Sequence, residues 1–132
     1  MRLFLFILVL LWCSGSGCHK AEEGPLGCIK VRIVGHICAE AVFQLLDSSY
    51  FHLGENGWKQ GDQTYDHVFH SFLTCTDIEY LSKLAAPSVI GKELFVGLLD
   101  NNVDRDCIVC EATFAHPPAT RQIVKFRLGE CE

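Results

Sequence analysis

The stretch CIKVRIV at residues 28–34 decides the fold. Its apolar residues Ile29, Val31 and Ile33 fall on one face of an extended chain, and the two basic residues between them fall on the other. This two-residue alternation is typical of a β-strand with one face buried and the other in water. The pattern recurs along the chain, so we expect an all-β domain.

The cleanest repeat of the pattern lies near the end of the chain, at residues 121–128. There Val124, Phe126 and Leu128 are expected to point inward, with basic residues between them pointing outward. Four further segments have the composition or the alternation of strands. These expected strands are residues 41–47, 65–73, 93–99 and 107–114.

One short helix is expected after Thr76, which is suited to the N-cap position. Glu79 follows three residues later as in a capping box, and Ile78, Leu81 and Ala85 form one apolar stripe. A proline two residues beyond the stripe should end the helix. About six short strands and one short helix predict a small disulfide-stapled β-sandwich, immunoglobulin-like in outline, or a small barrel.

The first 17 residues predict an export signal. Arg2 supplies a positive charge, residues 3–12 form an apolar run, and small or polar residues follow it. The run is shorter than the roughly 20 apolar residues that span a bilayer, and no second run follows, so we expect no transmembrane segment. We expect residues 18–27 to form a short polar tether and residues 28–132 a single secreted, extracellular domain.

The cysteines of an exported chain fold in an oxidising compartment, where thiols pair. Of the eight cysteines, Cys13 belongs to the expected signal, which leaves an odd number, seven. Cys18 is the natural odd one out, because the sequence from Ser14 to Cys18 resembles a bacterial lipoprotein cleavage site, where the first mature residue is lipidated. Plain secretion and a lipid anchor at a bacterial cell envelope both stay open. The disulfide candidates are Cys28, Cys38, Cys75, Cys107, Cys110 and Cys131.

The charge balance narrows the class of partner. Without Arg2 the 11 basic residues become 10, against 16 acidic residues, which gives a formal charge of −6. A negative balance argues against nucleic acid and against anionic membranes as electrostatically bound partners.

Two cysteine patterns have the spacing or the composition of reactive sites. Cys107-x-x-Cys110 has the spacing of a thiol–disulfide oxidoreductase, but its strand-like flanks lack the helix N-terminus that lowers a thiol pKa. A zinc site that adds Cys28 and Cys38 is disfavoured in an oxidising compartment. Structural disulfide bonding is therefore the favoured interpretation.

Histidines offer the other candidate chemistry, through His52, His67 and His70. His67 and His70 are three positions apart, so on one strand they face opposite sides and cannot share a metal ion. The sequence contains no nucleophile elbow and no catalytic-cysteine signature, and the acidic loop at 100–106 lacks EF-hand spacing. We expect no catalytic residue, no metal site and no cofactor.

Aromatic residues gather in a glycine-rich loop. The candidate binding residues there are Tyr50, Phe51, His52, Leu53 and Trp58. Exposed rings are costly and often mark a contact surface. The alternative is that these side chains cap one end of the core.

Four segments carry a resemblance to a known family: KVRIVGHIC at 30–38, VFQLLD at 42–47, DQTYDHVF at 62–69 and LFVGLLDN at 94–101. Together they resemble the nematode transthyretin-like family of secreted β-sandwich proteins. The resemblance implies a transthyretin-like sandwich over about residues 29–128. Related hydroxyisourate hydrolases use a C-terminal Tyr-Arg-Gly-Ser sequence, whereas this chain ends in LGECE, so the resemblance implies no such activity.

The sequence therefore predicts an exported, non-enzymatic binding protein that engages a small apolar or lipid ligand, or a surface partner, through loops such as 50–58. The alternative is a cysteine-framework inhibitor or effector that acts on an extracellular protein through exposed loops such as 100–106 or 116–118. A third hypothesis is a hydrolase that uses one of the three histidines named above. An enclosed apolar cavity would favour the first hypothesis, and a long disulfide-pinned loop would favour the second.

Overall fold

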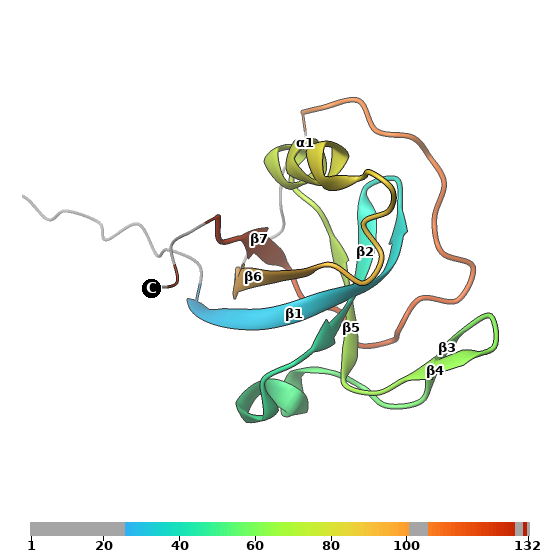
Figure 1. The fold of residues 1–132 in the computed structure, drawn as a ribbon, viewed down its shortest axis with the longest axis vertical. Helices are drawn as coiled ribbons and strands as arrows, with labels where there is room; N and C mark the ends of the chain where they lie inside the picture. Colours follow the sequence, from blue (N-terminus) through green and yellow to red (C-terminus); the bar gives the residue numbers. More distant parts are fainter. Residues whose placement is uncertain (1–25, 101–105, 129–130, 132) are drawn as a thin grey trace, which may run out of the picture.

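The computed structural model describes residues 26–100, 106–128 and 131 (Figure 1). The expected export signal at 1–17, the lipidation candidate Cys18 and the expected tether up to residue 25 lie outside the described residues. Residues 101–105 of the acidic loop lie outside them as well.

A five-stranded antiparallel sheet forms the centre of the described structure, with strand order β5-β2-β1-β6-β7. The first strand is the longest, because the alternating stretch that opens the domain continues on both sides of residues 28–34. The strands are β1 (Leu26–Ile37), β2 (Glu40–Leu45), β5 (Val68–Phe72), β6 (Glu93–Leu98) and β7 (Val124–Phe126).

Three smaller elements complete the fold. A 3-10 helix, η1 (Ser48–Leu53), follows β2, and a two-stranded hairpin of β3 (Trp58–Gln60) and β4 (Gln63–Tyr65) follows η1. The α-helix α1 (Cys75–Leu84) lies between β5 and β6. With their strands, one α-helix and three disulfides, the described residues confirm the predicted fold class.

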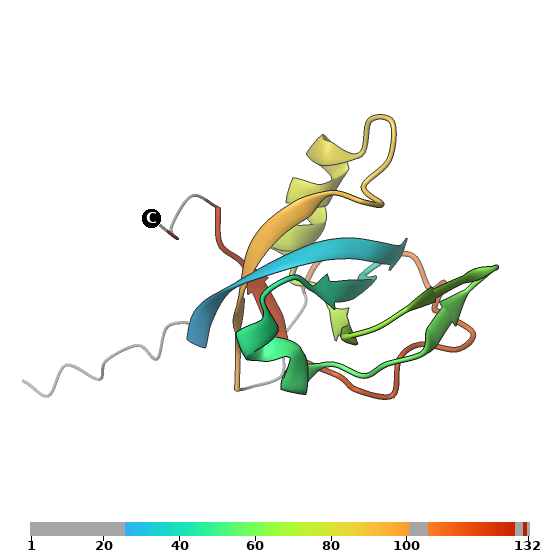
Figure 2. The same ribbon diagram turned by 60° about the horizontal axis from the view of Figure 1, so that its bottom comes forward.

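The sheet buries apolar residues on both faces. The larger core contains Ile29, Val31 and Ile33, as the alternation predicts, together with Phe43 and Leu81 of α1. Figure 2 shows α1 on the opposite side of β1 and β2 from the β3–β4 hairpin, which covers a smaller core. The smaller core consists of Val34, Val42, Trp58 and Val68, with Tyr65 and Phe114 packed against it.

The helix begins two residues earlier than predicted. Thr74 is the N-cap, and its hydroxyl accepts a hydrogen bond of 3.1 Å from the N–H of Asp77. Asp77 is buried, and its carboxylate accepts the N–H of Phe126 at 3.1 Å, which ties α1 to β7. The prediction of Ala85 in the apolar stripe was wrong, because Ala85 is the exposed C-cap residue.

Two of the expected strands differ from the structure. The strand expected at 65–73 is interrupted at His67, whose positive φ of 58° turns the chain between β4 and β5. At 121–128 only the central three residues pair with β6, so Val124 and Phe126 are buried as predicted, but Leu128 is exposed.

The prediction of a strand at 107–114 was wrong. Residues 108–114 form no helix, strand or turn. Ile108 and Val109 give the segment a strand-like composition, but Cys107 and Cys110 are bonded to two other elements and hold it outside the sheet. This departure from the prediction produces the most unusual surface of the molecule.

Candidate functional site

All six candidate cysteines are paired in the structure. The bonds join Cys28 to Cys131, Cys38 to Cys110 and Cys75 to Cys107, with Cα atoms 5.4 to 5.9 Å apart. This connectivity was left open by the sequence. Cys107 and Cys110 do not pair with each other, so the Cys107-x-x-Cys110 motif is not an internal redox disulfide.

Two of the bonds fasten one segment to one corner of the fold. Cys38 lies in the turn between β1 and β2, and Cys75 is the first residue of α1. These two attachment points are adjacent, because the N–H of Leu73 donates to the carbonyl oxygen of Ala39 at 2.8 Å. The residues between Cys107 and Cys110 are therefore held at both sides by a rigid base.

We call residues 107–113 the stapled loop. The loop begins on the α1 side of the molecule, and the chain that continues from it (orange in Figure 1) runs outside the sheet before it returns beside the hairpin. After the bridged Cys110, residues 111–113 are all exposed. The chain regains contact with the protein core at Phe114.

Ile108 at the start of this loop has an exceptional environment. Its relative exposure is 103%, whereas the other exposed large apolar side chains among the described residues, Ile90, Phe95 and Leu128, reach only 39% to 49%. Burying an isoleucine side chain is worth about 1.5–3 kcal/mol, and the described fold gains none of this at Ile108. The neighbouring Val109 is half-buried. The loop thus presents one aliphatic side chain completely to solvent.

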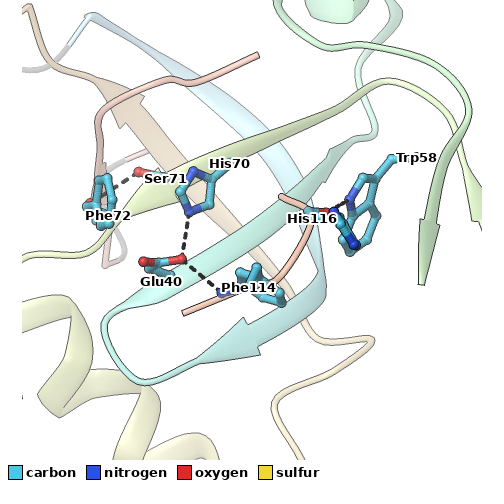
Figure 3. A network of polar contacts seen from close by, with 7 residues as sticks. All are labelled: Glu40, Trp58, His70, Ser71, Phe72, Phe114 and His116. Atoms are coloured by element: carbon cyan, nitrogen blue, oxygen red, sulfur yellow. Dashed lines mark hydrogen bonds and ion pairs between the residues drawn. The ribbon is translucent and has the colours of Figure 1, made fainter. Parts of the chain in front are cut away.

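Phe114 closes the other end of the loop. Its N–H lies 3.4 Å from Glu40 Oε2, and its ring meets the ring of Trp58 edge-on at 6.3 Å (Figure 3). Gly35 of β1 makes room for this contact, because a Cβ there would lie 3.2 Å from the Phe114 ring and 3.3 Å from Trp58. The glycine in the long first strand therefore allows the chain beyond the loop to pack against the sheet.

Glu40 and His70 form the buried polar pair on this face of the sheet. His70 Nε2 lies 3.1 Å from Glu40 Oε2, and each side chain is 7% exposed. The rings of Phe72 and Phe114 pack edge-on against the imidazole at 5.0 and 6.2 Å. A buried carboxylate is costly unless it is paired and hydrogen-bonded. This pair therefore supplies Phe114 with a fixed acceptor at the base of the loop.

Trp58 and Glu55 hold the chain that follows Phe114. Trp58 is buried, and its Nε1–H donates to the carbonyl oxygen of His116 at 2.9 Å. Glu55 Oε2 accepts the N–H of Thr120 at 2.5 Å. Burial alone would raise the pKa of Glu55, but hydrogen bonds from Thr120 and from the N–H of Ala119 lower it.

The five predicted aromatic-loop residues do not form one surface. Tyr50, Phe51 and Leu53 of η1 are partly buried and pack against the larger core, while His52 is exposed. Trp58 belongs to the smaller core on the other face of the sheet. The structure thus separates Trp58 from the other four candidates.

The three candidate histidines are separated as well. His67 stacks on Phe51, with ring centroids 3.8 Å apart, whereas His70 pairs with Glu40 on the opposite face of the sheet. Within the described ranges, no three histidine, cysteine or acidic side chains gather as they would around a metal ion. No helix in that part of the chain combines the length and the apolar character needed to cross a membrane.

Sequence reasoning missed three residues of this site: Ile108, Glu40 and Phe114. A charged residue at the start of the apolar run 39–43 was a signal for a buried pair. Ile108 lies between two cysteines, and in a disulfide-rich chain this pattern is compatible with a loop fixed by two disulfides as well as with a strand. Phe114 gave no comparable signal.

The chain matches no protein-family model, and no match to it was found among curated proteins or among solved structures. The resemblance to the nematode transthyretin-like family therefore stays a prediction from the sequence.

Proposed function

We propose that this chain is an exported, extracellular and non-enzymatic binding protein that recognises another protein through the stapled loop. One observation carries the proposal: Ile108 is fully exposed between two cysteines that are bonded to the body of the fold. Of the two binding hypotheses from the sequence, a disulfide-pinned loop favours the one in which the partner is an extracellular protein.

The physical advantage of such a loop is that its conformation is already restricted before binding. Ordering a flexible loop in a complex costs about 0.5–1.5 kcal/mol for each immobilised side chain. Two disulfides and the Phe114 contacts remove part of this cost in advance. Aliphatic side chains in such positions act as anchors when they enter a pocket of the partner.

A small apolar or lipid ligand at residues 50–58 has less support. Tyr50, Phe51 and Leu53 are already packed against the larger core, and Trp58 donates to the carbonyl oxygen of His116. A ligand that used these side chains would have to replace contacts that stabilise the fold.

The test compares three forms of the oxidised protein immobilised on beads: the natural sequence, Ile108→Asp and Ile90→Asp. Ile90 is an exposed isoleucine outside the loop, so it provides a matched control. Extracellular fluid is passed over each form, and the retained proteins are identified by mass spectrometry. We expect a protein retained by the natural sequence and by Ile90→Asp, and lost with Ile108→Asp. Identical retention by all three forms would contradict the proposal.

The expected route of export needs a separate measurement. The intact mass of the protein recovered from its natural source distinguishes cleavage before Cys18 with a free N-terminus from cleavage with a lipid on Cys18. Recovery of a chain that retains residues 1–17 would contradict the predicted signal peptide.

A further inference from the structure

We infer that the stapled loop is the reactive loop of a serine protease inhibitor, and that Ile108 is the residue that enters the primary specificity pocket. This inference rests on the proposed function and names its partner class. The partner would be an extracellular serine protease whose pocket accepts β-branched aliphatic side chains, as in the elastase type.

The backbone of the loop has the first property that a protease requires. Proteases bind peptides in an extended form, through main-chain groups that are not already used in secondary structure. Residues 108–114 form no helix, strand or turn, and the chain from 111 to 113 is exposed. The backbone of residues 111–113 is therefore placed where a second protein can pair with it, whereas the N–H of Phe114 is already directed at Glu40.

The side chain of Ile108 has the second property. The primary pocket of a serine protease selects substrates by the shape and charge of one side chain that it encloses. Ile108 is fully exposed, while the next residue, Val109, is half-buried. One aliphatic side chain thus projects alone, in the position of an anchor residue.

The disulfides explain why the loop would inhibit a protease instead of serving as its substrate. In the first step, the serine Oγ of the protease bonds to the carbonyl carbon of Ile108. The bond from that carbon to the nitrogen of Val109 breaks, and the catalytic histidine passes the serine proton to this nitrogen. Hydrolysis of the acyl-enzyme ester by water would release the carboxylate of Ile108 and free the protease, so inhibition requires that the new amine of Val109 reacts with this ester before water does.

In the acyl enzyme the two new ends cannot separate. Cys107 still holds the acyl side through Cys75, and Cys110 still holds the amine side through Cys38. A reacting group held in place has a high effective concentration, so the amine of Val109 attacks the acyl enzyme again and restores the peptide bond. The protease therefore remains occupied.

The charged residues beside the loop indicate the charge that the partner carries around its active site. Asp106 and Glu111 flank the two bridging cysteines, and both are exposed. Complementary charges across an interface raise the association rate. We therefore expect a protease with a basic rim around its active site.

The test uses the full oxidised chain against three purified serine proteases, of elastase, chymotrypsin and trypsin type. We expect the natural sequence to inhibit the elastase-type enzyme at one inhibitor per enzyme. Ile108→Val should keep this inhibition. Ile108→Arg should weaken it by at least about 30-fold, the loss typical of a central anchor residue, and should create inhibition of the trypsin-type enzyme. Ile90→Arg is the matched control and should change neither activity.

Two results would overturn the inference. One is the absence of inhibition by the natural sequence together with the absence of trypsin-type inhibition by Ile108→Arg. The other is complete cleavage between Ile108 and Val109 with full return of protease activity, which would make the loop a substrate.

The bead experiment distinguishes a failure of the proposed function from a failure of this inference. If the bead experiment finds a partner that is lost with Ile108→Asp but is not a protease, the protein-binding function stands and the inhibitor inference falls. If no protein depends on Ile108 in that experiment, both fall.

Discussion

Replacement of Cys38 and Cys110 by alanine should lower the free energy of unfolding by about 3.7 kcal/mol, as should replacement of Cys75 and Cys107. The two bonds close chain separations of 72 and 32 residues, which taken alone would make the first worth about 0.7 kcal/mol more than the second. The third disulfide removes this difference.

With Cys28 bonded to Cys131, the unfolded chain has a shorter path between Cys38 and Cys110. This path runs 10 residues back to Cys28, crosses the bond, and runs 21 residues back from Cys131 to Cys110. The restrained loop is then about 31 residues long, close to the separation of 32 between Cys75 and Cys107. In the chain-entropy model, both loops contribute about 3.7 kcal/mol at 25 °C.

Urea denaturation of the two double variants, without reducing agent, measures both losses. Small domains are stable by about 5–15 kcal/mol, so each variant should remain folded in water but with a clearly lower midpoint. A loss for the Cys38 and Cys110 variant that exceeds the other by about 0.7 kcal/mol or more would refute the shared-path reasoning. A loss below about 1 kcal/mol in both would show that these bonds do not restrain the unfolded chain.

Three further predictions concern single side chains. Trp58→Phe removes the N–H that donates to the carbonyl oxygen of His116, and it should lower the free energy of unfolding by about 1–3 kcal/mol in urea denaturation. The chain after Phe114 should also be cleaved faster by proteases. Unchanged proteolysis would show that Trp58 does not hold this segment. Burial raises the pKa of Asp77, so the folded state binds the proton of this carboxyl more tightly than the unfolded state does, and stability falls as pH rises from the ordinary value of 3.8 to the raised pKa. Asp77→Asn should therefore gain stability relative to the natural sequence over this pH range. A difference in stability that does not change with pH would contradict the prediction. Burial lowers the pKa of His36, so the stability of the fold should fall as pH drops through the ordinary value of 6.5. In thermal unfolding at pH 5 to 8, His36→Asn should lose this decrease in stability. An unaltered pH profile of the variant would show that His36 does not cause the decrease.

Periodicity made part of the fold predictable. The strand pattern at 28–34 is maintained by burial on one face, so Ile29, Val31 and Ile33 had to share the core. The oxidised state of the cysteines followed from the expected export, but their pairing depends on which strands lie beside each other. The order of the strands in the sheet cannot be read from any single segment of the sequence.

The stapled loop was not predictable for the same physical reason. Residues 107–114 have the β-branched composition of a strand, but the bonds to Cys38 and Cys75 hold them outside the sheet. The hairpin of β3 and β4 was not predicted, because its strands have three residues each, too few to show an alternation. Glu40 could be suspected from its apolar neighbours, but its partner His70 lies 30 positions away in the sequence.

The bond between Cys28 and Cys131 turns the intervening polypeptide into a closed covalent circle. A cut at any one peptide bond inside that circle opens it but releases no fragment, so the nicked molecule keeps its size on a non-reducing gel and gains only the mass of one water. The polypeptide between Cys28 and Cys131 therefore has to be severed at least twice before a protease can remove any part of it.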